Sequence, residues 1–414
     1  MRAFGPEGIT RTRGPVERWT SWLQRADGLN HDRVIAWGGI LLTLEIMFLG
    51  FLILWHHNVF TPVNPPASTD FVSFYAAGKL ALAGTPEFAY DRAAHAAAEA
   101  SATMPGTPYQ FFFYPPVYLL LCAPLALLPY MVAFVGFQAA TASAWLFVMR
   151  RILGARGWAW CLPVLAYPAV FWTFGLGQNA LLTAALLGGV TLLIDKRPIQ
   201  AGILLGLLCY KPHLALLAPI ALAAGGRWRA FAAAGVTVAA LVGLSIAVFG
   251  TETWRDYLGA LAGSSAVYEN GSVDLAAFVT PYGAARIFGA TPDAAWFAQG
   301  IFTFLSALAV SWVWWRNPGP AERSIALAAG ILLSIPLALI YDSLLLTVAM
   351  AWLVKASRLT GFMKWEKPAL VLCFLVPLIS RDLGQHEHMA VAPLAPTSLL
   401  ALCLMRTLRT KVTA

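Results

Sequence analysis

The chain has 414 residues, of which 59% are hydrophobic and only 12% are charged, and its mean hydropathy is +0.68. So few charged side chains cannot cover a water-soluble globule, and the apolar residues form blocks long enough to cross the ~30 Å hydrocarbon core of a bilayer. The net charge of +8 does not point to a nucleic-acid partner, because the basic residues are distributed as membrane topology requires. We therefore predict an all-α polytopic membrane protein.

The N-terminal segment, residues 1–33, is polar and basic and is predicted to be cytoplasmic. Val16, Trp19 and Trp22 recur there at helical spacing, which is typical of a short helix at the membrane surface. Residues 34–408 are predicted to form one transmembrane domain. Its apolar blocks predict about twelve membrane helices, at residues 34–55, 130–149, 158–174, 179–194, 198–210, 212–224, 228–249, 296–315, 323–341, 342–357, 367–380 and 389–406.

Two long loops are predicted on the outer face, at about residues 56–114 and 250–295. The first contains helical patterns at 71–83 and 92–103. The apolar piece from Pro115 to Pro129 is too short and too rich in proline to cross comfortably, so we expect it to be re-entrant or to lie at the outer surface.

Basic residues set the orientation of this scheme. Of the 28 lysines and arginines, 22 fall on the side of the N-terminus, which is therefore predicted to be cytoplasmic together with the C-terminus. Acidic residues show the reverse distribution, with 12 of 20 outside. Because acids contribute little to topology, this enrichment indicates a functional site on the outer face. The six basic residues predicted to lie outside are Lys79, Arg92, Lys211, Arg255, Arg286 and Arg381.

Asp70 is the acid that says most about a possible site, because it lies in the first outer loop, after the first membrane helix. It precedes a helical pattern in which Phe71, Phe74 and Tyr75 share one face. Thr69 or Asp70 could simply cap that helix, or Asp70 could serve a site where the membrane surface meets the loop.

The order of several short motifs resembles glycosyltransferase family 87 (GT87). These motifs begin with Asp-Phe-x-x-x-Tyr-x-Ala-Gly at Asp70, and the likeness covers roughly residues 34–350. The remaining motifs are Tyr90-Asp91, Phe113–Val117, Pro124–Pro129, Gly177–Asn179, Ala201–Pro212 and Tyr341-Asp342.

The resemblance implies a GT-C-like fold and an enzyme that takes a sugar, mannose in the familiar members, from a polyprenyl-phosphate donor. It also implies that an aspartate of the first outer loop, here Asp70, is the general base, and that no metal or other cofactor is needed. The chemistry agrees, because inverting transfer needs a base for the acceptor proton and a cation for the departing phosphate. The absence of a glycine-rich phosphate loop and of a nucleotide-binding domain favours a lipid-linked donor.

Lys211 is the leading candidate for binding the donor phosphate, since it lies between two short apolar runs and Pro212 breaks the helix after it. A snorkelling lysine is the alternative. His213 could donate to the same phosphate or be a packing histidine, and Lys79 could bind phosphate or lie on a solvated face.

Sugar or acceptor recognition is assigned to residues near the predicted outer boundary. Gln178 and Asn179 could bind hydroxyls or cap the following helix. Asp342 could bind hydroxyls or pair with a cation such as Arg381. Tyr75 and Tyr341 are grouped with them.

Two other polar features are given weaker interpretations. Glu45 lies in the middle of the first span and is expected to be protonated or to face the bundle interior, with a structural role. His386 and His388 resemble a metal half-site, but histidines spaced this way in a loop are weak evidence, and no metal is predicted.

We predict an inverting glycosyltransferase in the plasma membrane, with its active site on the outer face and a lipid or glycan acceptor. Two alternatives remain at this point: a transporter or flippase of lipid-linked sugars, and a non-catalytic protein of envelope assembly.

Overall fold

The structure, a computed structural model, describes residues 20, 24–55, 70–103, 108–263 and 274–409. The predicted surface helix around Val16–Leu23 and the start of the first outer loop lie outside the described residues. Within the described part all regular structure is helical, apart from one isolated bridge between Phe278 and Leu339. The α-helices are α2 (His31–Trp55), α3 (Phe71–Leu82), α4 (Arg92–Ala102), α5 (Leu119–Ala126), α6 (Tyr130–Leu153), α7 (Cys161–Leu165), α8 (Pro168–Leu176), α9 (Ala180–Leu193), α10 (Pro198–Leu207), α11 (Leu217–Ala224), α12 (Trp228–Ala262), α14 (Pro281–Ile287), α15 (Pro292–Arg316), α16 (Pro320–Ser334), α17 (Leu345–Thr360), α18 (Glu366–His386) and α19 (Leu394–Arg409).

Short 3-10 turns join several of these helices near the site described below. They are η1 (Pro86–Ala89), η2 (Pro116–Tyr118), η3 (Leu208–Tyr210), η4 (Pro212–Ala215), η5 (Leu275–Ala277) and η6 (Ile340–Leu344).

Six helices of the described part are long and apolar enough to cross a membrane. The other predicted spans correspond to shorter helices, such as α9 with 14 residues, or to broken ones, such as α7 and α8, which are separated before Pro168. The predicted count of about twelve spans therefore remains a prediction, while the membrane character and the helical class are confirmed. The six candidate spans are His31–Phe51, Tyr130–Leu153, Trp228–Ala262, Pro292–Arg316, Ile340–Thr360 and Glu366–His386.

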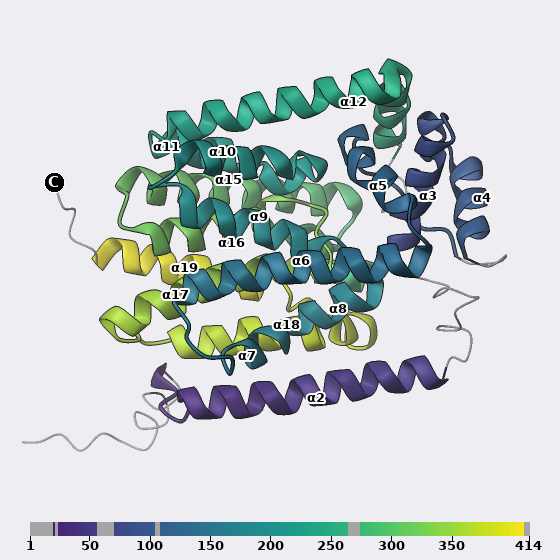
Figure 1. Ribbon diagram of the computed structural model, residues 1–414. Coiled ribbons are helices and arrows are strands. Elements are labelled where there is room, and N and C mark those ends of the chain that lie inside the picture. Colours follow the sequence, from purple (N-terminus) through teal and green to yellow (C-terminus); the bar gives the residue numbers. More distant parts are fainter. Residues whose placement is uncertain (1–19, 21–23, 56–69, 104–107, 264–273, 410–414) are drawn as a thin grey trace, which may run out of the picture.

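The long helices run side by side, and the helices of the first predicted outer loop lie together at one end of them (Figure 1). At that end α3 packs against α4 and α5. The start of α2 and the end of α19 lie at the opposite end of the molecule, on the left of Figure 1. The start of α2 and the end of α19 therefore lie away from α3, α4 and α5.

Glycines allow the shorter helices to approach one another closely. A Cβ at Gly78 of α3 would lie 2.2 Å from the carbonyl oxygen of Cys122 in α5, and one at Gly202 of α10 would lie 2.4 Å from that of Ala230 in α12. Such contacts between small residues are the usual way for membrane helices to pack without large apolar side chains between them. Gly250, at φ 82° and ψ 167°, breaks α12 where the predicted span 228–249 ends.

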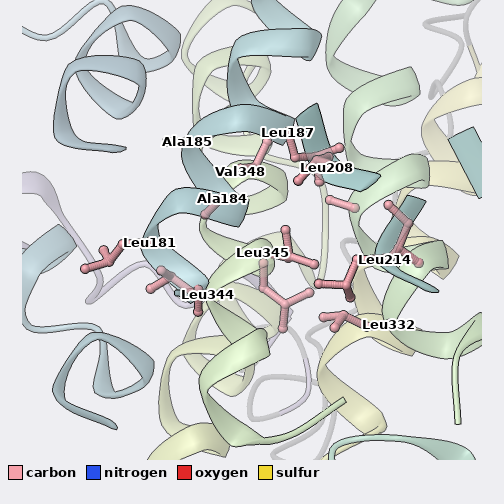
Figure 2. Close-up of a cluster of buried hydrophobic side chains, with 14 of the residues drawn as sticks. Leu181, Ala184, Ala185, Leu187, Leu208, Leu214, Leu332, Leu344, Leu345 and Val348 are labelled. Carbon is pink, nitrogen blue, oxygen red and sulfur yellow. The ribbon is translucent and has the colours of Figure 1, made fainter. Parts of the chain in front are cut away.

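Buried apolar side chains from several segments of the chain form one cluster (Figure 2). Its side chains come from α9, from η3 and η4 on either side of Lys211, from α16, and from the residues after Asp342. These chain segments therefore meet in a packed core, and the polar residues between them are held in fixed positions. The labelled members are Leu181, Ala184, Ala185, Leu187, Leu208, Leu214, Leu332, Leu344, Leu345 and Val348.

Candidate active site

Asp70 occupies the N-cap position of α3, but its side chain does not cap the helix. Its Oδ2 instead accepts a hydrogen bond of 2.5 Å from Nε2 of Gln178, a residue 108 positions further along the chain. The interpretation of Asp70 as a helix cap is therefore wrong. The side chain is directed to a tertiary partner, which is expected of a residue with a role beyond local structure.

Gln178 and Asn179 form the turn between α8 and α9. Gly177 ends α8 at φ +68°, and a Cβ there would lie 2.8 Å from side-chain atoms of Phe71 and Phe134, so the turn packs tightly against α3 and α6. Both amides are buried. Close packing at this glycine thus brings the Gln178 side chain to Asp70.

Asn179 holds the N-cap position of α9, and its side chain makes no cap hydrogen bond. Its Nδ2 donates 3.0 Å to the hydroxyl of Tyr118 in η2. Its Oδ1 is buried and has no hydrogen-bond partner. The capping alternative for Asn179 is wrong, and the amide instead links α9 to the segment before α5.

Lys211 and Asp342 form a buried ion pair. Nζ of Lys211 donates to Oδ1 of Asp342 at 3.0 Å, and about 95% of each side chain is inaccessible to solvent. The second carboxylate oxygen accepts the backbone N–H of Leu339 at 3.1 Å. The suggested partner of Asp342, Arg381, is wrong, because Arg381 pairs with Asp274 at 2.8 Å.

Aromatic rings line the space between the two polar groups. The Tyr114 hydroxyl donates to Oε1 of Gln178 at 3.4 Å, and its ring centroid lies 6.0 Å from Nζ of Lys211. The ring of Tyr341 lies 5.2 Å from the same Nζ, and Tyr118 stacks on Tyr114 with centroids 4.5 Å apart. Cations interact favourably with such ring faces, so these rings stabilise the buried lysine.

The electrostatic environment makes Asp70 a stronger base than an ordinary carboxylate. Burial raises its pKa, and the hydrogen bond from Gln178 and the positive charge of Lys211 act in the opposite direction. The net direction is upward, because loss of hydration is the largest influence. Lys211 is therefore close enough for its charge to act on Asp70.

Three of the predicted residues occupy other positions. Lys79 is exposed near the far end of α3, roughly 13 Å along the helix axis from Asp70, and its Nζ lies over the Tyr75 ring. The Tyr75 hydroxyl donates to the carbonyl of Leu128 at 2.8 Å. His213 is close in sequence to Lys211 but exposed. The structure therefore brings Asp70, Gln178, Asn179, Lys211, Tyr341 and Asp342 together, leaves Tyr75 and Lys79 outside that cluster, and places His213 at its edge.

The sequence interpretation missed Tyr118 and Gln138 as members of the site. Nε2 of Gln138, in α6, donates to the carbonyl of Gln178 at 3.1 Å. A glutamine in the middle of an apolar helix was the available signal, because a buried amide in such a helix requires a partner.

Among the described residues, no group of three or more His, Cys, Asp and Glu side chains could hold a metal ion. Nδ1 of His386 lies 3.2 Å from Oδ1 of Asp382, and both side chains are exposed. This pair belongs to the end of α18 and makes no part of the site.

Fold and site together define a helical membrane protein with a buried carboxylate, an amide and an ion pair at one end of its bundle. The family model for glycosyltransferase family 87 matches residues 112–340, more than half of the chain. The protein therefore belongs to glycosyltransferase family 87. The matched region contains Gln178 and Lys211, whereas Asp70 lies well before its start and Asp342 just after its end. No curated protein and no solved structure matches the chain.

Proposed function

We propose that this protein transfers mannose or a related sugar from a polyprenyl-phosphate carrier to a hydroxyl group of a lipid or glycan acceptor.

 The transfer takes place on the outer face of the plasma membrane and inverts the configuration at the anomeric carbon. One observation carries this proposal: in a member of a glycosyltransferase family, Asp70 is held by Gln178 and lies within the electrostatic influence of Lys211. A base and a cation are the groups that this reaction requires.

Asp70 acts as the general base. The acceptor oxygen attacks the anomeric carbon, the bond from that carbon to the phosphate oxygen breaks, and the acceptor proton passes to the Asp70 carboxylate. The raised pKa of Asp70 favours this proton transfer, and the hydrogen bond from Gln178 fixes the orientation of the carboxylate.

Lys211 stabilises the departing polyprenyl phosphate, on which negative charge grows as the bond breaks. An ammonium group has three N–H donors, and Asp342 uses one of them. Asp342 thus holds Nζ in place between the rings of Tyr114 and Tyr341 while leaving donors for phosphate oxygens. His213, two residues further on, is a second donor at the edge of this site.

The membrane character of the chain supports a lipid-linked donor. Six candidate spans anchor the bundle, and the site lies at the end where α3, α4 and α5 gather. A polyprenyl chain in the bilayer would present its phosphate and sugar at such a membrane boundary. Gln178, Asn179 and Tyr341 supply amide and hydroxyl groups for binding the sugar or acceptor.

The donor is tested with membranes that contain the protein and those that lack it. Radiolabelled polyprenyl-phosphate mannose and radiolabelled GDP-mannose are supplied separately, with formation of polyprenyl-phosphate mannose blocked. Covalent labelling of acceptors from the lipid-linked donor alone is the expected result. Movement of the donor across vesicles without covalent transfer would support a flippase instead, and labelling from GDP-mannose alone would overturn the proposed donor.

A further inference from the structure

His95 and Glu99 form a buried pair in α4 that plays no part in the mechanism above. Their side chains are 0% and 2% exposed, and Nδ1 of His95 lies 3.5 Å from Oε1 of Glu99. Both of these atoms are buried without a hydrogen-bond partner. Two unpaired polar atoms that face each other in the protein interior are costly unless a proton lies between them.

The surroundings determine where that proton resides. Nε2 of His95 lies 3.1 Å from the carbonyl oxygen of Ser73, which can only accept, so Nε2 carries a hydrogen. In the neutral ring Nδ1 is then an acceptor, and Oε1 of Glu99 must be the donor. Burial lowers the pKa of His95 to about 4 and raises the pKa of Glu99 to about 7, which is the distribution that this arrangement requires.

The pair connects α4 to the chain that builds the active site. Oε2 of Glu99 accepts the backbone N–H of Gln110 at 3.0 Å, and Ser73, bound by His95, lies in the first turn of α3 after Asp70. The hydroxyl of Ser73 donates to the carbonyl of Phe111 at 3.3 Å. The segment 109–114 is thus fastened near its start, and it ends at Tyr114, whose hydroxyl contacts Gln178.

We propose that Glu99, protonated and hydrogen-bonded to His95, is a positioning residue that holds the segment 109–114 against the Asp70 site and releases it when the proton is lost. This inference rests on the proposed function. An ionised Glu99 would face the lone pair of His95 and add a second negative charge near Asp70, and both effects disfavour the aligned arrangement.

The charged and titratable groups around Glu99 agree with this role. Asp70, from α3, contributes to the raised pKa of Glu99 by its negative charge. On the segment side, Tyr109 has its pKa raised to about 12 by burial and by Glu99, and remains neutral in the relevant range. The guanidinium carbon of Arg92 lies 5.3 Å from the Tyr109 ring centroid, so the positive charge of Arg92 faces that ring. No cation on these neighbours forms an ion pair with Glu99 in the described part of the chain.

The first test is the pH dependence of sugar transfer by the full-length protein. Glu99→Gln reproduces the protonated acid, because its amide N–H₂ donates to Nδ1 of His95 and its oxygen accepts from Gln110. We expect wild-type transfer to fall roughly tenfold per pH unit above about 7, while Glu99→Gln stays within about twofold up to pH 9. Glu99→Ala should be impaired at every pH, and Glu87→Gln, an acid of the same region, should keep the wild-type profile.

An alkaline decline in Glu99→Gln like that of the wild type would overturn the proposal, as would an inactive Glu99→Gln protein that is folded. A Glu99→Gln protein that fails to fold would also overturn it, because the amide should replace the protonated acid.

A second measurement needs no activity, so it separates this inference from the proposed function. The folded pKa of Glu99 lies above its ordinary value, so its contribution to stability is complete at low pH and is lost as pH rises towards about 7. The Tm of the wild type in detergent should therefore fall by several degrees more than that of Glu99→Gln between pH 5 and pH 8. Parallel Tm curves would exclude the shared proton even if no donor were ever transferred.

Discussion

At the scale of single residues, the sequence identifies the chemical groups better than their partners. The sequence predicts polar roles at membrane boundaries for Asp70, Gln178, Lys211 and Asp342, and the structure brings these four residues together. The pairing of Lys211 with Asp342 spans 131 residues and depends on how α10, α11 and α17 pack, which no local pattern specifies. The wrong partner suggested for Asp342, Arg381, was an equally plausible outer cation by sequence alone.

The buried ion pair leads to a prediction about stability. Lys211→Gln or Asp342→Asn alone leaves one buried charge without its partner, and each should lower the free energy of unfolding by about 3–5 kcal/mol. The double variant, in which the two amides can bond to each other, should recover much of that loss. Thermal unfolding in detergent measures all three, and additive losses in the double variant would show that the pair is not coupled.

The same series also separates structure from chemistry. If Lys211 binds the departing phosphate, the double variant remains inactive in sugar transfer although its stability is recovered. Restored transfer in that variant would mean that Lys211 serves only to neutralise Asp342.

At the scale of helices, the sequence predicts existence and approximate limits well. Proline and glycine mark many boundaries, as at Pro198, Pro292, Gly154 and Gly250, and the two helical patterns of the first outer loop became α3 and α4. What was not predicted is that α7 and α8 are separate, or that α5 lies against α3. The break between α7 and α8 falls at Pro168, which the predicted span 158–174 did not take into account, whereas the contact of α5 with α3 depends on the close approach of Gly78 to residues distant in the sequence.

The contact between α3 and α5 gives a prediction at this scale. A methyl group at Gly78 would collide with the carbonyl of Cys122 and with Ala126, so Gly78→Ala should destabilise the protein by roughly 1–3 kcal/mol and reduce transfer, because α3 carries Asp70. Gly136→Ala in α6 meets nothing within 4 Å and is the matched control. Thermal unfolding of the two variants decides, and equal midpoints would mean that α3 and α5 can separate without cost.

At the scale of the whole molecule, composition and the distribution of basic residues account for the helical membrane class. Figure 1 adds that the helices of the first predicted outer loop lie opposite the start of α2 and the end of α19. Tyr114, Tyr118 and the His95–Glu99 pair could not be assigned from the sequence, because their roles depend on how α4 and the segment 109–114 fold over α3. The sequence therefore predicts that the functional site lies at the end of the bundle formed by the first outer loop. The structure adds the residues that surround Asp70 there.

The orientation in the membrane can be measured by cysteine labelling in intact cells. Ala93→Cys, on the exposed surface of α4, should react with an impermeant maleimide from outside, whereas Lys196→Cys, exposed between α9 and α10, should react only after the membrane is opened. The wild type, with its five native cysteines, gives the background. The reverse pattern would place the site on the cytoplasmic face and contradict the proposed location.

The most direct test of the central claim compares sugar transfer by the wild type with that by Asp70→Asn, using radiolabelled polyprenyl-phosphate mannose in membranes. The substitution keeps the size of the side chain and an acceptor for Gln178 but removes the base. The control is Asp91→Asn, the same substitution at the start of α4. We predict that Asp70→Asn lowers the transfer rate by at least about 100-fold at normal protein abundance, while Asp91→Asn stays near the wild type. Equal transfer by the wild type and Asp70→Asn would contradict the assignment of Asp70 as the base.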